Sequence, residues 1–163
     1  MRLVAARSKV IRAALIVGTS VCCLTGCDTT IFWGPMSIQR DGAHLLVAVC
    51  QSIDVIDGFA SESNEAESVP WHRFWNEEGS TFLSKGTIFR PADGIKGLSA
   101  SLLGDPSMSA GSDIAVTLNA VRAEDGLSGE FVVGAHGLSE TTWLHPDGSR
   151  TKEPCDAADR KPD

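Results

Sequence analysis

Short apolar runs with alternating polar positions recur along most of this chain. Ile114, Val116, Leu118 and Ala120 alternate with polar or small residues, which is the period-two pattern of a strand with one buried face. Residues 45–50 are apolar at nearly every position, as in a strand that is covered on both faces. Strand-length runs rich in β-branched and aromatic residues occur at 43–50, 53–56, 81–83, 87–89, 114–121, 130–133 and 141–144.

Five Asp-Gly pairs separate or interrupt these runs. Between apolar runs such a pair favours a tight turn with positive φ, so we expect turns at 41–42, 57–58, 93–94, 125–126 and 147–148. Residues 97–103 have room for one short helical turn. The pattern predicts an all-β fold, either a single antiparallel β-sandwich or a small barrel, of about seven to eight strands.

Composition sets the limits of this domain. We place the β-rich domain at residues 31–155. Residues 60–68 are dense in Ser and Glu and residues 156–163 are charged, so we expect a loop without regular structure at 60–68 and a disordered tail at 156–163.

The N-terminal segment has a different pattern. Four basic residues lie within the first twelve positions and precede an apolar stretch at 13–24, which is the order typical of a secretory signal. A membrane-spanning helix needs about 20 consecutive apolar residues. This stretch is shorter and is interrupted at residues 18–20, so the secretory interpretation is favoured.

Leu24-Thr25-Gly26-Cys27 resembles the lipobox of bacterial lipoproteins, which has Leu first, a small residue before the cleaved bond, and Cys after it. The resemblance implies a signal peptide at 1–26, a Cys27 thiol that carries diacylglycerol with acyl chains such as palmitate, and a lipidated N-terminus with a short tether at 27–30. It places the protein on the extracytoplasmic face of the cell membrane. The alternative is an ordinary secreted protein with Cys27 in a disulfide.

The tether between the lipid and the domain is short. Only Asp28, Thr29 and Thr30 separate Cys27 from Ile31-Phe32-Trp33. We therefore expect the domain to lie close to the bilayer, with Trp33 at the interface, where aromatic rings with a polar tip are favoured.

Charge limits the partners of the mature chain. Cleavage after Gly26 removes four of the 14 basic residues and none of the 21 acidic ones, so the formal net charge changes from −7 to −11. Nucleic acids are bound through Lys and Arg, so no nucleic-acid partner is expected. The expected contact with the membrane is the N-terminal lipid, because an acidic surface is not attracted to anionic lipid.

Two cysteines remain in the mature domain after lipidation of Cys27. Cys50 and Cys155 lie in a chain predicted to be exported to an oxidising compartment, which predicts a disulfide between them. Two unpaired thiols are the alternative, because the distance between the Cα atoms is not given by the sequence.

Trp71-His72-Arg73-Phe74-Trp75 is the most unusual local string. In a regular strand Trp71, Arg73 and Trp75 share one face, where two indoles beside a guanidinium form a candidate binding surface for a sugar or an aromatic side chain. The competing interpretation is that these rings fill the core or cover a sheet edge.

Reactive motifs do not emerge from the rest of the sequence. The four histidines, at positions 44, 72, 136 and 145, lack the near-neighbour spacing of zinc sites, and no catalytic residue, metal ligand or cofactor is assigned. We expect a non-enzymatic binding or scaffolding domain with an envelope protein or a glycan as partner. The alternative is a small extracytoplasmic hydrolase or a metal-dependent enzyme on the same β domain.

Overall fold

Ten β-strands and a short 3-10 helix make up the regular structure in the computed structural model, which describes residues 35–64 and 69–156. The expected signal peptide, Cys27 with its tether, Trp33 and the tail beyond residue 156 lie outside the described residues. The elements in chain order are β1 (Met36–Asp41), β2 (His44–Val49), β3 (Ile53–Asn64), β4 (Val69–Leu83), β5 (Ile88–Phe89), β6 (Leu98–Leu102), β7 (Ser112–Ala120), η2 (Ala123–Asp125), β8 (Leu127–Val132), β9 (Trp143–Leu144) and β10 (Arg150–Thr151).

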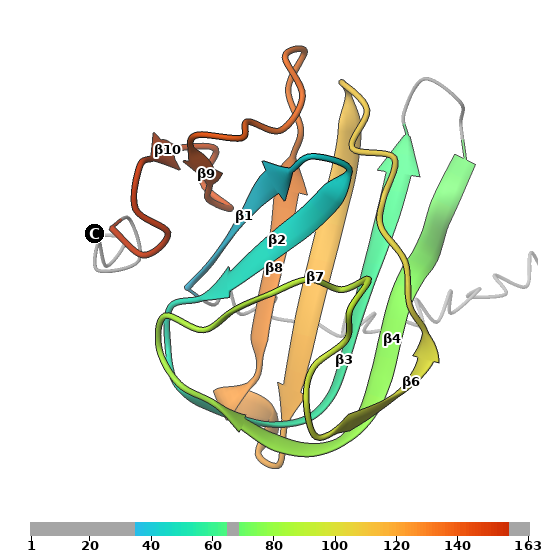
Figure 1. Cartoon of the computed structure of the whole chain (residues 1–163), viewed down its shortest axis with the longest axis vertical. Coiled ribbons are helices and arrows are strands. Elements are labelled where there is room, and N and C mark those ends of the chain that lie inside the picture. The colour runs from blue at the N-terminus through green and yellow to red at the C-terminus, as the bar shows by residue number, and fades with distance from the viewer. Residues whose placement is uncertain (1–34, 65–68, 157–163) are drawn as a thin grey trace, which may run out of the picture. The chain divides into compact units, whose positions relative to one another are not determined.

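The strands form two antiparallel sheets that pack face to face (Figure 1). One sheet has the order β10-β9-β1-β2-β5 and the other has the order β6-β4-β3-β7-β8. The fold is therefore a β-sandwich, the first of the two predicted alternatives. All seven predicted runs overlap a strand, but β1, β6 and β10 raise the number to ten, above the predicted seven or eight.

β7 forms as its pattern predicts. Its nine residues alternate between buried and half-buried along the whole strand, and Ile114, Val116, Leu118 and Ala120 all point into the core. β7 pairs with β3 on one side and β8 on the other, so it lies inside its sheet.

Three of the five Asp-Gly pairs lie in turns with a left-handed glycine. Gly42 (φ 62°) joins β1 to β2, Gly94 (φ 75°) lies in the loop after β5, and Gly148 (φ 81°) joins β9 to β10. Gly126 follows η2 in the connection from β7 to β8, with φ −64°. The turn predicted at 57–58 is wrong, because Gly58 lies within β3.

Two other local predictions are also wrong. Residues 60–64 belong to β3 and pair with both β4 and β7, so the predicted loop without regular structure is contradicted over this part. Residues 98–102, predicted as part of a helical turn, form edge strand β6 against β4. Both segments contain polar residues that do not resemble a strand in the sequence. They form strands because pairing with the long strand β4 supplies their backbone hydrogen bonds.

Glu62 explains how an acidic residue is accommodated inside β3. It is buried, and its carboxylate accepts hydrogen bonds from the Ser107 backbone N–H (2.8 Å), the Ser107 hydroxyl (2.6 Å) and the Met108 N–H (3.2 Å). Met108 has a positive φ of 51°, which is uncommon for a residue other than glycine. The carboxylate thus satisfies its own acceptors and fixes the connection between β6 and β7.

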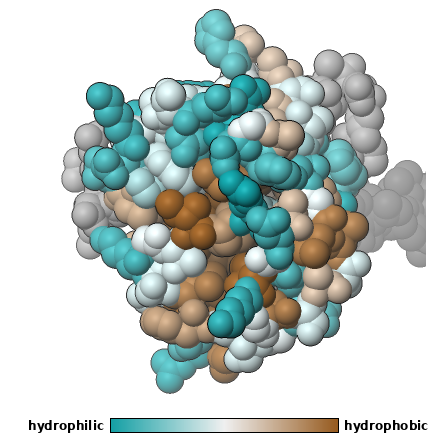
Figure 2. Space-filling view, in the orientation of Figure 1, coloured by the Kyte–Doolittle hydropathy of each residue, from teal (hydrophilic) through white to brown (hydrophobic). Residues whose placement is uncertain are grey.

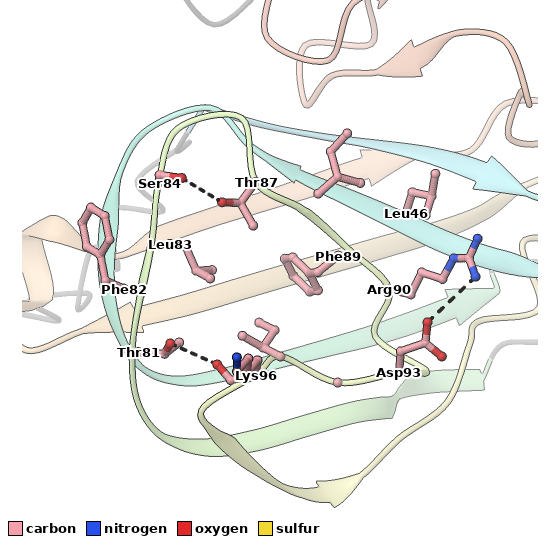
Figure 3. A pocket seen from close by; sticks show the side chains of 13 residues that line it. Leu46, Thr81, Phe82, Leu83, Ser84, Thr87, Phe89, Arg90, Asp93 and Lys96 are labelled. Carbon is pink, nitrogen blue, oxygen red and sulfur yellow. Dashed lines mark hydrogen bonds and ion pairs between the residues drawn. The ribbon is translucent and has the colours of Figure 1, made fainter.

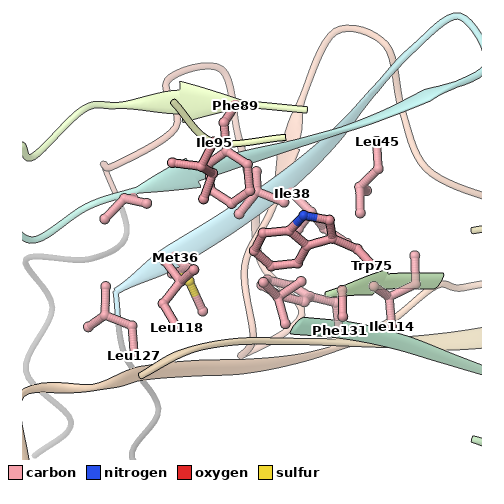
Figure 4. Close-up of a cluster of buried hydrophobic side chains, with 14 of the residues drawn as sticks. Met36, Ile38, Leu45, Trp75, Phe89, Ile95, Ile114, Leu118, Leu127 and Phe131 are labelled. Atoms are coloured by element: carbon pink, nitrogen blue, oxygen red, sulfur yellow. The ribbon is translucent and has the colours of Figure 1, made fainter. Parts of the chain in front are cut away.

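Trp75 lies fully buried between the two sheets (Figure 4). Its ring centroid is 5.5 Å from that of Phe89 on β5, so the two sheets meet through this pair. Side chains from both sheets surround it, among them Met36, Ile38, Leu45, Ile114, Leu118 and Phe131.

The predicted disulfide between Cys50 and Cys155 is present, with the Cα atoms 5.2 Å apart. It joins the end of β2 to the segment that follows β10. The Ser37 hydroxyl also donates a hydrogen bond to the Pro154 carbonyl (2.6 Å). The C-terminal part of the described chain is therefore held against the sheet of β1 and β2.

Candidate functional site

A cleft of about 760 Å³ lies beside β5 (Figure 3). Its volume falls in the range of roughly 300–1,000 Å³ that is usual for small-molecule sites. The face shown in Figure 2 is hollowed, and hydrophobic and hydrophilic residues alternate around the hollow. The cleft is lined by Leu46 of β2, by Thr81, Phe82, Leu83 and Ser84 at the end of β4, by Thr87, Ile88 and Phe89 around β5, and by Arg90, Asp93, Gly94, Ile95 and Lys96.

The apolar lining has a buried part and an exposed part. Leu83, Phe89 and Ile95 are buried and belong to the core, so this part of the lining is continuous with the packing around Trp75. Phe82 and Ile88 are 61% and 48% exposed. Large apolar side chains left in water beside a hollow are typical of a binding surface.

A buried carboxylate positions the loop on the other side of the cleft. Glu77 of β4 is 2% exposed, and its carboxylate accepts a hydrogen bond from the Ile95 backbone N–H (2.8 Å). A Cβ at Gly94 would lie 2.4 Å from Oε1 of Glu77, and Gly94 has the left-handed φ of 75°. Glycine at 94 and glutamate at 77 therefore fix the position of the Asp93–Lys96 segment together.

Polar groups line the rest of the cleft. The Thr81 hydroxyl donates to the Lys96 carbonyl (3.1 Å), and the hydroxyls of Ser84 and Thr87 are 3.3 Å apart. Arg90 forms ion pairs with Asp41 and, at 3.9 Å, with Asp93.

The charge of the lining differs from that of the chain. Two bases, Arg90 and Lys96, and one acid, Asp93, line the cleft, whereas acidic residues outnumber basic ones by 21 to 14 in the whole sequence. Arg90 is neutralised by its two acidic partners, so the cleft combines apolar surface and hydroxyls with charged groups of both signs, which suits a ligand with an apolar part and a hydrogen-bonding polar part.

The binding surface predicted from Trp71, Arg73 and Trp75 is not formed. Trp71 is 45% exposed and Arg73 is exposed, but Trp75 is fully buried. The prediction for Trp75 is therefore wrong, and the alternative that this ring fills the core is correct.

A β-bulge explains the different directions of these side chains. Arg73 pairs with Ser61 and Trp75 pairs with Ala60, so Phe74 is an extra residue on β4. The alternation of faces is shifted there, and Trp75 points into the sandwich.

Arg73 makes other contacts on the outer face of this sheet. Its guanidinium lies over the Phe59 ring at 4.3 Å from the centroid and donates a hydrogen bond to the Asn76 side-chain oxygen (3.0 Å). Arg73 is thus engaged with its own sheet.

The histidines are dispersed over the described structure. His44 Nδ1 is 2.9 Å from Asp105, and His72 Nε2 is 3.8 Å from Glu62, whereas His136 is exposed. Within residues 35–64 and 69–156, no three His, Cys, Asp or Glu side chains form a group that could hold a metal ion.

His145 has a pKa that is shifted by its surroundings. Burial lowers its pKa below the usual value of 6.5, while the negative charges of Asp147 and Asp156 act in the opposite direction. The Thr151 hydroxyl donates its single proton to the Glu153 carbonyl (2.5 Å), so it accepts the 2.7 Å hydrogen bond from His145 Nε2–H. These groups lie around β9 and β10 and do not line the cleft.

Sequence reasoning missed the cleft because its residues share no linear motif. Residues 81–83 and 87–89 were identified as strands only, and Leu46 was assigned to a strand covered on both faces. The only local signal was the Asp93-Gly94 turn. What makes the site is the juxtaposition of β2, β4 and β5, which depends on tertiary packing.

No protein family, no curated protein and no solved structure matches this chain. The fold and the site thus define an antiparallel β-sandwich that carries a disulfide and an open amphipathic cleft. In the part of the chain that the structure describes, no helix is long and apolar enough to span a bilayer.

Proposed function

We propose that this protein is a bacterial lipoprotein of the cell envelope. In this proposal, lipid on Cys27 anchors the chain to the extracytoplasmic face of the cell membrane. The support is the order of basic residues, apolar stretch and Leu24-Thr25-Gly26-Cys27 at the N-terminus. A diacylglycerol on the thiol supplies two long acyl chains, which are enough for stable attachment where one chain is marginal.

We further propose that the β-sandwich binds a ligand in the cleft beside β5 without turning it over. The observation that carries this proposal is the lining, in which exposed Phe82 and Ile88 lie beside hydroxyls and the charged side chains of Arg90, Asp93 and Lys96. An envelope protein and a glycan are the candidate ligands. Both offer apolar faces next to hydrogen-bonding groups, which is the combination that this lining can recognise.

Photocrosslinking from inside the cleft tests the binding role. A diazirine-bearing lysine analogue replaces Lys96, and the matched control carries it at Lys152, which is also exposed but lies beyond β10. Irradiation of cells is expected to give a discrete adduct at position 96 and none at 152. The mass of the adduct distinguishes a protein from a glycan, and equal labelling at both positions would contradict the binding role.

Replacement of the lipidated residue tests the anchor separately. The Cys27→Ser protein cannot form the thioether to diacylglycerol, so it is expected in the soluble extracytoplasmic fraction with its 50–155 disulfide intact. Membrane fractionation and intact mass measure the two properties. If intact mass shows that residues 1–26 have been removed and the Cys27→Ser protein still stays in the membrane fraction, the anchor is refuted and the proposal for the cleft is unaffected.

A further inference from the structure

Three strongly exposed apolar side chains lie at the same end of the sandwich. Val121 is 75% exposed, Phe82 61% and Ile88 48%. β3 begins at this end, since Ile53 pairs with Leu83 of β4 and Val55 pairs with Ala120 of β7. In Figure 1 this is the lower end, where η2 lies. We call Phe82, Ile88 and Val121 the apolar end.

The described chain also begins at this end. The Cys50 N–H donates to the Pro35 carbonyl (2.7 Å), and the adjacent Val49 carbonyl accepts from the Gly86 N–H (2.7 Å). Pro35, where the described chain begins, and the turn between β4 and β5 therefore flank the same end of β2. The exposed apolar residues Trp71 and Val132 lie away from it, toward the opposite ends of β3 and β7.

The length of chain before Pro35 limits how far this end can lie from Cys27. Residues 28–34 separate the two positions, so a fully extended connection reaches at most about 28 Å. The 15 residues of β4 would span about 50 Å as an extended strand. A lipid on Cys27 therefore holds the apolar end near the bilayer, while the far end of the long hairpin can lie well away from it.

We propose that the apolar end is a docking surface for the lipid bilayer, with Phe82, Ile88 and Val121 in the interfacial layer. This inference rests on the proposed lipid anchor. Three exposed side chains bind a membrane weakly by themselves, but the tether keeps them at high effective concentration beside it, so that a weak contact suffices.

The charges at this end are mixed in sign. Arg122, Glu124 and Asp125 adjoin Val121, and Asp54 pairs with Phe82 across the sheet. The named residues are one base and three acids, which anionic lipid does not attract, so docking depends on apolar contact and is not expected to weaken at high salt. Phe82 and Ile88 also line the cleft, so docking places the mouth of the cleft at the membrane surface, where these two side chains contact lipid and the ligand is one that is held at that surface.

Quenching by brominated lipid tests the docking surface. The full-length lipidated protein is reconstituted in vesicles of phosphatidylethanolamine and phosphatidylglycerol, with or without bromine on the acyl chains. Two matched variants add one indole at an exposed valine, Val121→Trp at the apolar end and Val132→Trp at the opposite end. The emission that Val121→Trp adds to wild type is expected to be lost in brominated vesicles, whereas the emission that Val132→Trp adds is expected to persist.

Flotation of the same vesicles separates the two proposals. If the protein floats with the vesicles and both added indoles behave alike, the docking surface is refuted and the anchor stands. If the protein does not float, the anchor is refuted and the docking surface with it. Phe82→Trp provides a second probe of the apolar end in case Val121→Trp disturbs folding, and it must be quenched as well.

Discussion

Trp75 owes its position between the sheets to a residue without a side chain. Gly58 of β3 lies directly against the indole, and a Cβ there would be 2.4 Å from Cη2 of Trp75 and 3.1 Å from Cδ2 of Leu118. Asp57-Gly58 resembles a hairpin turn in the sequence, yet this glycine is required by close packing. The same dipeptide thus has two physical meanings, and only tertiary structure distinguishes them.

Gly58→Ala is therefore expected to destabilise the fold. The added methyl group forces the indole or the strand to move in a close-packed core, which costs about 1–3 kcal/mol of unfolding free energy. Gly134→Ala is the matched control, because its Cβ would meet nothing within 4 Å and its φ is not left-handed, so a change within about 0.5 kcal/mol is expected. Urea unfolding monitored by tryptophan fluorescence compares the two, and equal midpoints would contradict the prediction.

The buried His145 predicts that the stability of the fold depends on pH. Burial lowers its pKa in the folded state, so the unfolded chain binds a proton more readily. The free energy of unfolding should then decrease as the pH falls through about 6.5, the unfolded value, and this loss should end below the folded pKa.

Two histidine variants isolate this contribution. His145→Gln is expected to flatten the slope of unfolding free energy against pH just below pH 6.5, whatever its effect on absolute stability. His136→Gln is the matched variant in which an exposed imidazole is removed. Chemical unfolding at a series of pH values measures the slope for both variants. An unchanged slope in His145→Gln would contradict the assignment of the pH dependence to His145.

At the scale of elements, a strand is predicted from sequence as well as its alternation is regular. The sequence predicts β7 correctly because this strand keeps strict alternation over nine residues. β4 was recognised only at its end, since the bulge at Phe74 interrupts the alternation and its buried Glu77 resembles a surface residue. β6 does alternate apolar Leu98, Ala100 and Leu102 with two serines, but it is exposed along most of its length, and its residues lie in the segment interpreted as having room for a helical turn. Bulges and buried acids are set by neighbouring strands, so a period-two pattern does not reveal them.

Glu77 is predicted to stabilise the fold by holding the loop that follows β5. Glu77→Ala removes the acceptor of the buried Ile95 N–H and is expected to cost about 1–3 kcal/mol, because the donor is left without a partner. Glu78→Ala, the exposed neighbour on the other face of β4, should change stability by less than about 0.5 kcal/mol. Glu77→Gln keeps a side-chain acceptor and should fall between them in thermal unfolding.

Glu77→Ala in β4 should also affect binding in the cleft. Ile95 lines the cleft, so release of its N–H should also reduce crosslinking from the Lys96 position. Equal crosslinking in Glu77→Ala and wild type would show that the loop is held by other contacts.

At the scale of the whole molecule, the sandwich closes through few contacts at its C-terminal edge. β9 meets β1 through a single register pair, Ile38 with Leu144, and β10 pairs only with β9. The disulfide supplements this weak pairing. Its two cysteines were predicted to pair from compartment and number, whereas the cleft was not predicted, because it arises from four segments that only the folded sheets bring together.

Removing the disulfide should therefore affect both global and local stability. Closure of the 105-residue separation constrains the unfolded chain by up to about 4.7 kcal/mol on the chain-entropy model, and measured losses for native bridges are commonly about 2–5 kcal/mol. The Cys50→Ala/Cys155→Ala variant should unfold at a lower urea concentration than the oxidised wild type. Because β10 then depends on short pairings, limited proteolysis should also cut after Lys152 before the core unfolds. Cleavage at Lys152 that appears only together with global unfolding would show that the edge strands hold without the bridge, and that the disulfide acts on the unfolded chain alone.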